Sequence, residues 1–156
     1  MHMSPIPSTH PTPPAGRLAP RTAAGLPGQP SAAQFGAIVM ACRASGGLAR
    51  GDELAWQLQE RGCGDFASLA RQIVTGQVFS FRWQDDFWVP LFQFDSEHDM
   101  AVKPALAGIL AALGPTFDGS ALAAWFTQAN AHLDGQMPAD RLDSDAAGVL
   151  RAARAS

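Results

Sequence analysis

The stretch that decides the fold lies in the last third of the chain and reads Trp125-Phe126-Thr127-Gln128-Ala129-Asn130-Ala131-His132-Leu133-Asp134-Gly135-Gln136-Met137-Pro138-Ala139-Asp140-Arg141-Leu142. A predicted helix that ends at Gly114-Pro115 precedes it, and a helix of small residues follows it. The stretch holds no nucleophile–base pair, cluster of metal ligands or phosphate-binding loop. We therefore expect a compact helical recognition surface, which favours binding over catalysis.

Length and composition favour one domain, or one domain with a tail. The chain has 156 residues, of which 47% are hydrophobic, so it can bury a sizeable core. Its net charge of −3 at pH 7 argues against strong non-specific binding of nucleic acid, which depends on Lys and Arg. No apolar run approaches the roughly 20 residues that span a bilayer, so we expect no contact with a membrane.

The cysteine content indicates a reducing compartment. Cys42 and Cys63 are too few for a disulfide framework and lack the paired spacing of a zinc site. We expect two reduced thiols that are buried or partly buried. The N-terminus also lacks the apolar segment of a secretory signal, so the predicted location is cytoplasmic.

Residues 1–30 differ in composition from the rest of the chain. Eight of the twelve prolines fall there, no acidic residue does, and large apolar residues are few. Such a segment cannot bury enough apolar surface to offset the entropy lost on ordering, so we expect a disordered tail with some polyproline II character. A passive tail is favoured over a proline-rich ligand for a partner.

Three helices are predicted between residue 31 and the middle of the chain. Their inner faces are formed by Phe35, Ile38, Val39 and Cys42, then by Leu54, Ala55 and Leu58, and then by Phe66, Leu69, Ala70 and Ile73. Ser31 and Asp65 are expected to cap the first and the third helix. Glycines at 46–47, 62 and 76 are expected to end all three.

The period of the pattern changes after Gly76. Apolar residues alternate over 79–83, a polar turn follows at 84–86, and a second apolar run covers 87–94. This pattern predicts a β-hairpin of two aromatic-rich strands. Pro90 cannot donate a ladder hydrogen bond, so we expect its strand to lie at the edge of the sheet.

Helical patterns return after an acidic loop. The loop carries four possible metal ligands, Asp95, Glu97, His98 and Asp99. It lacks the glycine and the spacing of an EF-hand, so we expect a solvated loop. Further helices are predicted from Pro104, from Asp118 or Ser120, from Pro138 and from Ser144.

The predicted architecture is a mainly α-helical domain of about six helices with one central β-hairpin. We divide the chain into the tail 1–30, a helical segment with the hairpin at 31–94, and a helical domain at 95–156.

One pattern in the second half is specific enough to compare with a known family. It consists of Trp125, Phe126, Asn130, Leu133, Gly135, Pro138 and Leu142, followed by a short helix that contains Gly148 and Val149. Upstream, Pro90-Leu91-Phe92-Gln93-Phe94-Asp95 adds a proline and a phenylalanine-glutamine-phenylalanine run. Over residues 77–156 this order and spacing resembles the toxin-binding domain of the MbcA/ParS/Xre antitoxin family.

The resemblance implies a small helical protein that binds a toxin, often an NAD-consuming enzyme of the RES type. It also implies a homodimer or higher oligomer, with a DNA-binding segment ahead of the domain that represses its own operon. Two features depart from the family. Asp134 stands where a glycine is common, which puts the turn after Leu133 in question. Residues 52–94 are too short for the full helix-turn-helix bundle and look like a degenerate winged-helix or excisionase-like unit.

The partner-binding surface is predicted on eight residues of the C-terminal stretch, Trp125, Phe126, Asn130, Leu133, Gly135, Met137, Pro138 and Leu142. The aromatic and apolar members would anchor a partner, because such side chains dominate interface hot spots. Asn130 and Gly135 would hold the turn, since both tolerate left-handed backbone. The competing interpretation places the two aromatic rings in the core.

A DNA-binding regulator or excisionase-like factor is the alternative function. Arg71 and Gln72 would then lie on a recognition helix, and Arg82 would act from the hairpin. Residues 43–82 are nearly neutral, however, which is a weak electrostatic match to DNA. An enzyme is least favoured, because the sequence shows no catalytic, cofactor-binding or metal-binding motif in a fitting context.

Overall fold

The computed structural model describes residues 28–114 and 116–156 of the chain. Over these residues it contains seven α-helices and five short strands. In chain order they are α2 (Ala32–Cys42), β1 (Leu48–Arg50), α3 (Gly51–Glu60), α4 (Phe66–Val74), β2 (Phe81–Trp83), β3 (Asp86–Pro90), β4 (Phe94–Asp95), β5 (Ala101–Val102), α5 (Leu106–Leu113), α6 (Gly119–Thr127), α7 (Pro138–Arg141) and α8 (Ala146–Arg154). The mainly α-helical class is confirmed, and the predicted hairpin is one part of a larger sheet. The predicted tail falls almost wholly outside the described residues.

Side-chain caps fix where the first helices begin. Ser31 and Asp65 each form a capping box, in which the cap and the third helical residue, Gln34 or Ser68, exchange side-chain and backbone hydrogen bonds. Two backbone N–H groups that the helix leaves unpaired are satisfied at each start. Both predicted caps are confirmed, because this signal is local in the sequence.

The last helix begins one residue later than predicted. Its cap is Asp145 and not Ser144, and the Oδ1 of Asp145 accepts a hydrogen bond of 3.0 Å from the Gly148 N–H. The carboxylate has a further use that a serine lacks. Its Oδ2 accepts a hydrogen bond of 3.2 Å from the Arg141 guanidinium, which joins α7 to α8.

The central strand of the three-stranded antiparallel sheet is β3, in the order β1-β3-β2. The prediction that Pro90 marks an edge strand is therefore wrong. Pro90 is tolerated because it is the last residue of β3, opposite Leu48, where the ladder ends. The chain then leaves the sheet in a 3₁₀ turn at Leu91–Gln93, so the predicted second strand, 87–94, ends early.

Gln93 is a fully buried polar side chain that fixes this exit from the sheet. Its amide oxygen accepts a hydrogen bond of 2.8 Å from the Phe79 N–H. Its amide nitrogen donates to the carbonyls of Phe79 and Pro90 at 3.0 and 2.9 Å. Phe92 and Phe94, on either side of Gln93, are buried in two different core clusters. The phenylalanine-glutamine-phenylalanine run therefore serves the fold.

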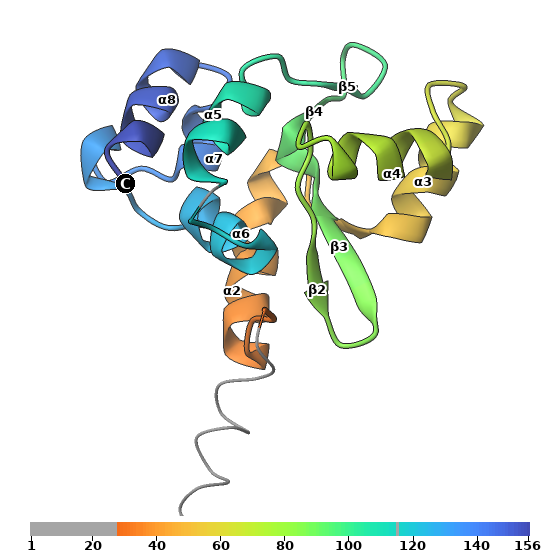
Figure 1. Ribbon diagram of the computed structural model, residues 1–156, viewed down its shortest axis with the longest axis horizontal. Helices are drawn as coiled ribbons and strands as arrows, with labels where there is room; N and C mark the ends of the chain where they lie inside the picture. Colours follow the sequence, from red (N-terminus) through yellow and green to blue (C-terminus); the bar gives the residue numbers. More distant parts are fainter. Residues whose placement is uncertain (1–27, 115) are drawn as a thin grey trace, which may run out of the picture.

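Two hydrophobic cores lie on opposite faces of the sheet (Figure 1). The first joins α2, α5, α6 and α8, and the second joins α3 and α4. Neighbouring residues of β3 serve different cores, Trp88 the first and Val89 the second, because side chains alternate along a strand. The first core draws on both sides of the predicted boundary at residue 94, since Ile38 and Phe126 belong to one cluster.

Candidate functional site

Four of the eight predicted partner-binding residues are core residues. Phe126 is fully buried, and Leu133, Pro138 and Leu142 are buried as well. The ring of Phe126 stacks on Phe79 at a centroid distance of 5.5 Å. These four side chains are unavailable to a partner in this fold, which corrects their assignment as anchors. The pattern that carries the family resemblance thus encodes mainly the packing of α6, α7 and α8.

The other four predicted residues remain at least partly accessible. Trp125 and Met137 are half-buried, as is Asn130, and Gly135 is exposed. Trp125 packs edge-on against Phe126, with the ring planes at 88°. Its indole Nε1 donates a hydrogen bond of 3.0 Å to the Ser156 Oγ, so the ring is held against the end of α8. Trp125 and Met137 are the two apolar side chains of the predicted set that stay partly accessible.

The turn after α6 is built by side-chain and backbone bonds around Asn130. The Asn130 Oδ1 accepts a hydrogen bond of 2.9 Å from the His132 N–H, and its own N–H donates to the Gln136 carbonyl at 3.0 Å. Asp134 and Gly135 follow with φ angles of 56° and 79°. Left-handed backbone favours glycine, but aspartate tolerates it. The aspartate therefore adopts the conformation that a glycine would supply, and Gly135 has the positive φ predicted for it. Asn130 instead has extended backbone, with a φ of −120°, and holds the turn through its side chain.

A polar cavity of about 400 Å³ lies beside this turn, between the turn, α7 and α8. Arg141 forms one wall, held by the Asp145 carboxylate and by the Gln136 Oε1, each at 3.2 Å. The Gly148 N–H first, and Arg141 second, hold the pKa of Asp145 below its usual range. A Cβ at Gly148 would collide with the Asp145 carboxylate, so this position requires glycine. Arg141 and Asp145 thus hold α7 against α8, while Asp134 and Arg151 of the same cavity take part in no ion pair among the described residues.

Three surface helices carry no charged side chain at all. Neither α2, α5 nor α6 contains Asp, Glu, Lys or Arg, although each has an exposed or half-exposed side. A surface helix of a soluble protein normally has a charged or polar outer face. The outer side of α2 instead shows Ala33, Gly36, Ala37 and Met40, the last with 62% of its surface exposed.

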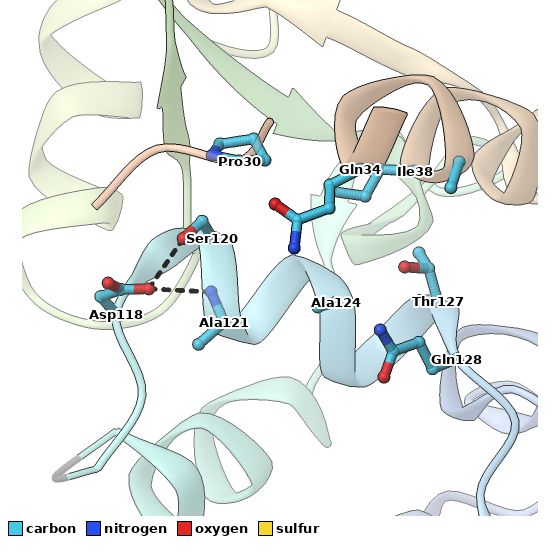
Figure 2. Close-up of a pocket in the computed structure, with 10 residues that line it drawn as sticks. Pro30, Gln34, Ile38, Asp118, Ser120, Ala121, Ala124, Thr127 and Gln128 are labelled. Carbon is cyan, nitrogen blue, oxygen red and sulfur yellow. Dashed lines mark hydrogen bonds between the residues drawn. The ribbon is translucent and has the colours of Figure 1, made fainter. Parts of the chain in front are cut away.

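A groove of about 300 Å³ runs between two of these helices, α2 and α6 (Figure 2). Ala37 and Ile38 line it from α2, and Ala121 and Ala124 from α6. Asp118, at one end, is the single charged residue among those that line it. Sequence reasoning missed this groove because its walls lie about 80 residues apart in the chain, although the absence of charge in both helices is visible in the sequence. We define the α2–α6 groove by these lining residues.

The residues proposed to read DNA do not form a basic surface. Arg71 and Arg82 are exposed and Gln72 is half-buried, while Asp85 and Asp86 lie at the tip of the hairpin. Phe66, predicted on the inner face of α4, is instead 56% exposed, although Leu69, one turn later, is buried. Apolar and acidic side chains, among them Val74, Asp85 and Asp86, line the same surface hollow as Arg82, and phosphate contacts favour neither kind.

Cys42 is the buried one of the two cysteines, and its surroundings suppress the reactivity of its thiol. Cys42 is buried, and burial first and Asp140 second raise the pKa of its thiol to about 11, which keeps it protonated and unreactive at neutral pH. No group of three or more His, Cys, Asp or Glu side chains in the described part of the chain could hold a metal ion. No helix there is long and apolar enough to cross a membrane.

Comparison of the chain with protein families, with curated proteins and with solved structures finds no match.

Proposed function

We propose that this chain is an antitoxin-like interaction module that binds and occludes a partner protein. The observation that carries the proposal is the pair of uncharged surface helices, α2 and α6, with an apolar groove between them. Apolar surface of this kind, left uncovered on a folded chain, is typical of a protein–protein interface. The resemblance over residues 77–156 supplies the class of partner, a toxin enzyme of the RES type.

The proposed docking surface combines the groove with the accessible anchors of the C-terminal region. α6 contributes to both, because Ala121 and Ala124 line the groove while Trp125 faces the end of α8. A half-buried tryptophan is already restrained, so it loses little side-chain entropy when a partner covers it. Inhibition would follow from covering the partner's active site, which requires no catalytic group on this chain.

The test is co-expression with the product of the reading frame next to this chain's gene, provided that this frame encodes a small enzyme. We expect a stable complex and relief of growth arrest caused by that product. Ala37→Glu, which places a charge in the groove from an exposed position, should weaken the complex at least tenfold, or about 1.4 kcal/mol. Ala67→Glu, at an exposed position on α4, is the matched control and should leave binding unchanged.

Three results would contradict the proposal or its location. Absence of any complex would reject the antitoxin function. Equal binding by wild type and a folded Ala37→Glu variant would reject the groove. Binding of upstream duplex DNA at low salt that is weakened by Arg71→Ala with Arg82→Ala would favour the DNA-binding alternative, because phosphate contacts make affinity fall steeply with salt.

A further inference from the structure

We propose that the α2–α6 groove is a binding site for the chain's own proline-rich segment, residues 1–27, which competes there with the partner. The competition rests on the proposed function, whereas docking of the segment does not. The proposal is drawn from where the segment joins the described residues, from the charges of the two parts and from the donors that line the groove.

The segment joins the folded part at one end of the groove. Pro30 is buried and lines the groove beside Asp118 and Ser120, as Figure 2 shows. The Gln29 Oε1 accepts a hydrogen bond of 3.0 Å from the Gln84 N–H, which ties the junction to the hairpin. Gly28 has a φ of 80°, a conformation that allows the chain to reverse direction.

The segment is long enough to follow the whole groove. The nine residues of α6 span roughly 14 Å at the helical rise of about 1.5 Å per residue. A polyproline II strand advances about 3.1 Å per residue, so roughly five residues would cover this length. Residues 20–27 suffice for the path and the reversal, and a sequence with Pro20 and Pro27 favours the extended conformation.

The charges of the two parts are complementary. Of the chain's eleven basic and fourteen acidic residues, residues 1–27 hold two arginines, Arg17 and Arg21, and no acidic residue. The net charge of the segment is therefore +2, and that of the remaining chain is −5. Asp118, at the end of the groove where the segment joins, takes part in no ion pair among the described residues. The opposite net charges of the two parts favour association of the segment with the folded part, whereas a second copy of the uncharged α2 would gain nothing from them.

The groove also supplies what a proline-rich backbone needs. Polyproline II carbonyls have no internal hydrogen bonds and need donors from outside. The Gln34 Oε1 is occupied by the Ser31 N–H at 2.8 Å, which turns the amide nitrogen of Gln34 toward α6. Ala37, Ala121 and Ala124 project only methyl groups into the groove, which leaves room for pyrrolidine rings.

Limited trypsin digestion of the full chain tests the docking without any partner present. Trypsin can cut after Arg17 and Arg21, and docking of residues 20–27 should slow the cut after Arg21 about tenfold relative to a synthetic peptide of residues 1–27, whereas Arg17 lies before the docked stretch and serves as an internal reference. Ala37→Trp fills the groove and should restore the rate of the peptide, while Ala67→Trp on α4 should not. The protection should weaken as salt rises, because salt screens the attraction between the basic segment and the acidic remainder of the chain.

A second variant keeps the test valid if Ala37→Trp fails to fold. Leu26→Asp lies outside the described residues and places a like charge near Asp118, so it should release the segment without altering the folded part. Equal cleavage of wild type, Leu26→Asp and the free peptide would overturn the proposal. Protection that depends on protein concentration would also overturn it, since a second copy would then hold the segment. If the segment competes with the partner, Leu26→Asp should also bind the partner more tightly than wild type does. If that increase is not seen while the segment is still protected in wild type, the docking stands and the competition is rejected.

Discussion

Helices α2 and α3 have similar lengths and pack beside the same sheet, yet their outer sides differ completely. α3 buries Leu54 and Leu58 and exposes Asp52, Glu53 and Glu60 to water. α2 buries Ile38 and Cys42 in the same way and exposes no charge. The single large apolar side chain exposed on α3, Trp56, stands among acidic and amide groups, as isolated surface residues often do. The outer side of α3 is thus typical of a solvated helix, whereas the outer side of α2 is the surface that we propose a partner covers.

The largest expected effect on stability concerns the inner side of α6, the helix that lies next to α2. Phe126→Ala removes a fully buried ring that packs against Phe79 and Phe92, and should lower the free energy of unfolding by about 3–5 kcal/mol. Trp125→Ala, one residue earlier, should cost less stability but more partner affinity. Urea denaturation and a binding titration of both variants measure the two effects. The reverse ranking would show that Phe126 is an anchor for a partner after all.

The inner sides of α2 and α3 should contribute about equally to the free energy of unfolding. Ile38→Ala and Leu58→Ala each empty a buried site, one in each core, and each should cost about 2–5 kcal/mol. Because the sites belong to separate clusters on opposite faces of the sheet, the double variant should be additive within about 0.5 kcal/mol. Strong non-additivity in urea denaturation would mean that the two cores behave as one.

Most of what the sequence predicted correctly depends on nearby residues. The caps at Ser31 and Asp65 and the turn at Gly135 each involve partners within a few positions. The central position of β3 could not be predicted, because it is set by pairing with the three-residue β1, about 40 residues upstream. The same limit applies to β4 and β5, whose two residues each carry no detectable period.

The candidate site was predicted less well than the fold, for a related reason. Trp125 and Phe126 are adjacent in the sequence, and periodicity alone does not say which of the two rings faces the core. Packing against Phe79, nearly 50 residues away, decides it. The groove likewise exists only when α2 meets α6, so its absence of charge gains meaning after the fold is known.

Making α2 resemble α3 should separate stability from function. Ala33→Glu together with Ala37→Lys creates an exposed pair four residues apart, which typically stabilises a helix by about 0.2–0.5 kcal/mol. The same pair places charge on the groove, so partner affinity should fall although the fold is slightly more stable. Thermal unfolding and a binding titration report the two quantities. Unchanged affinity would mean that the uncharged outer side of α2 has no role in binding.

The smallest effect concerns the caps, which are neutral on α2 and ionised on α4. The Ser68 N–H holds the pKa of Asp65 below its usual value in the folded chain, so the charged form is favoured by folding. The stabilisation is therefore present above the unfolded pKa, about 3.9, and is lost as pH falls through the folded pKa. Asp65→Ser copies the cap of α2 and should flatten this part of the acid dependence, whereas Ser31→Asp should steepen it. The measurement is the midpoint of urea denaturation between roughly pH 6 and pH 3, the range over which carboxylates titrate. The slope of this midpoint against pH should become flatter for Asp65→Ser and steeper for Ser31→Asp. If both variants keep the wild-type slope, the difference between the caps of α2 and α4 has no consequence for stability, and what sets α2 apart is confined to its outer side.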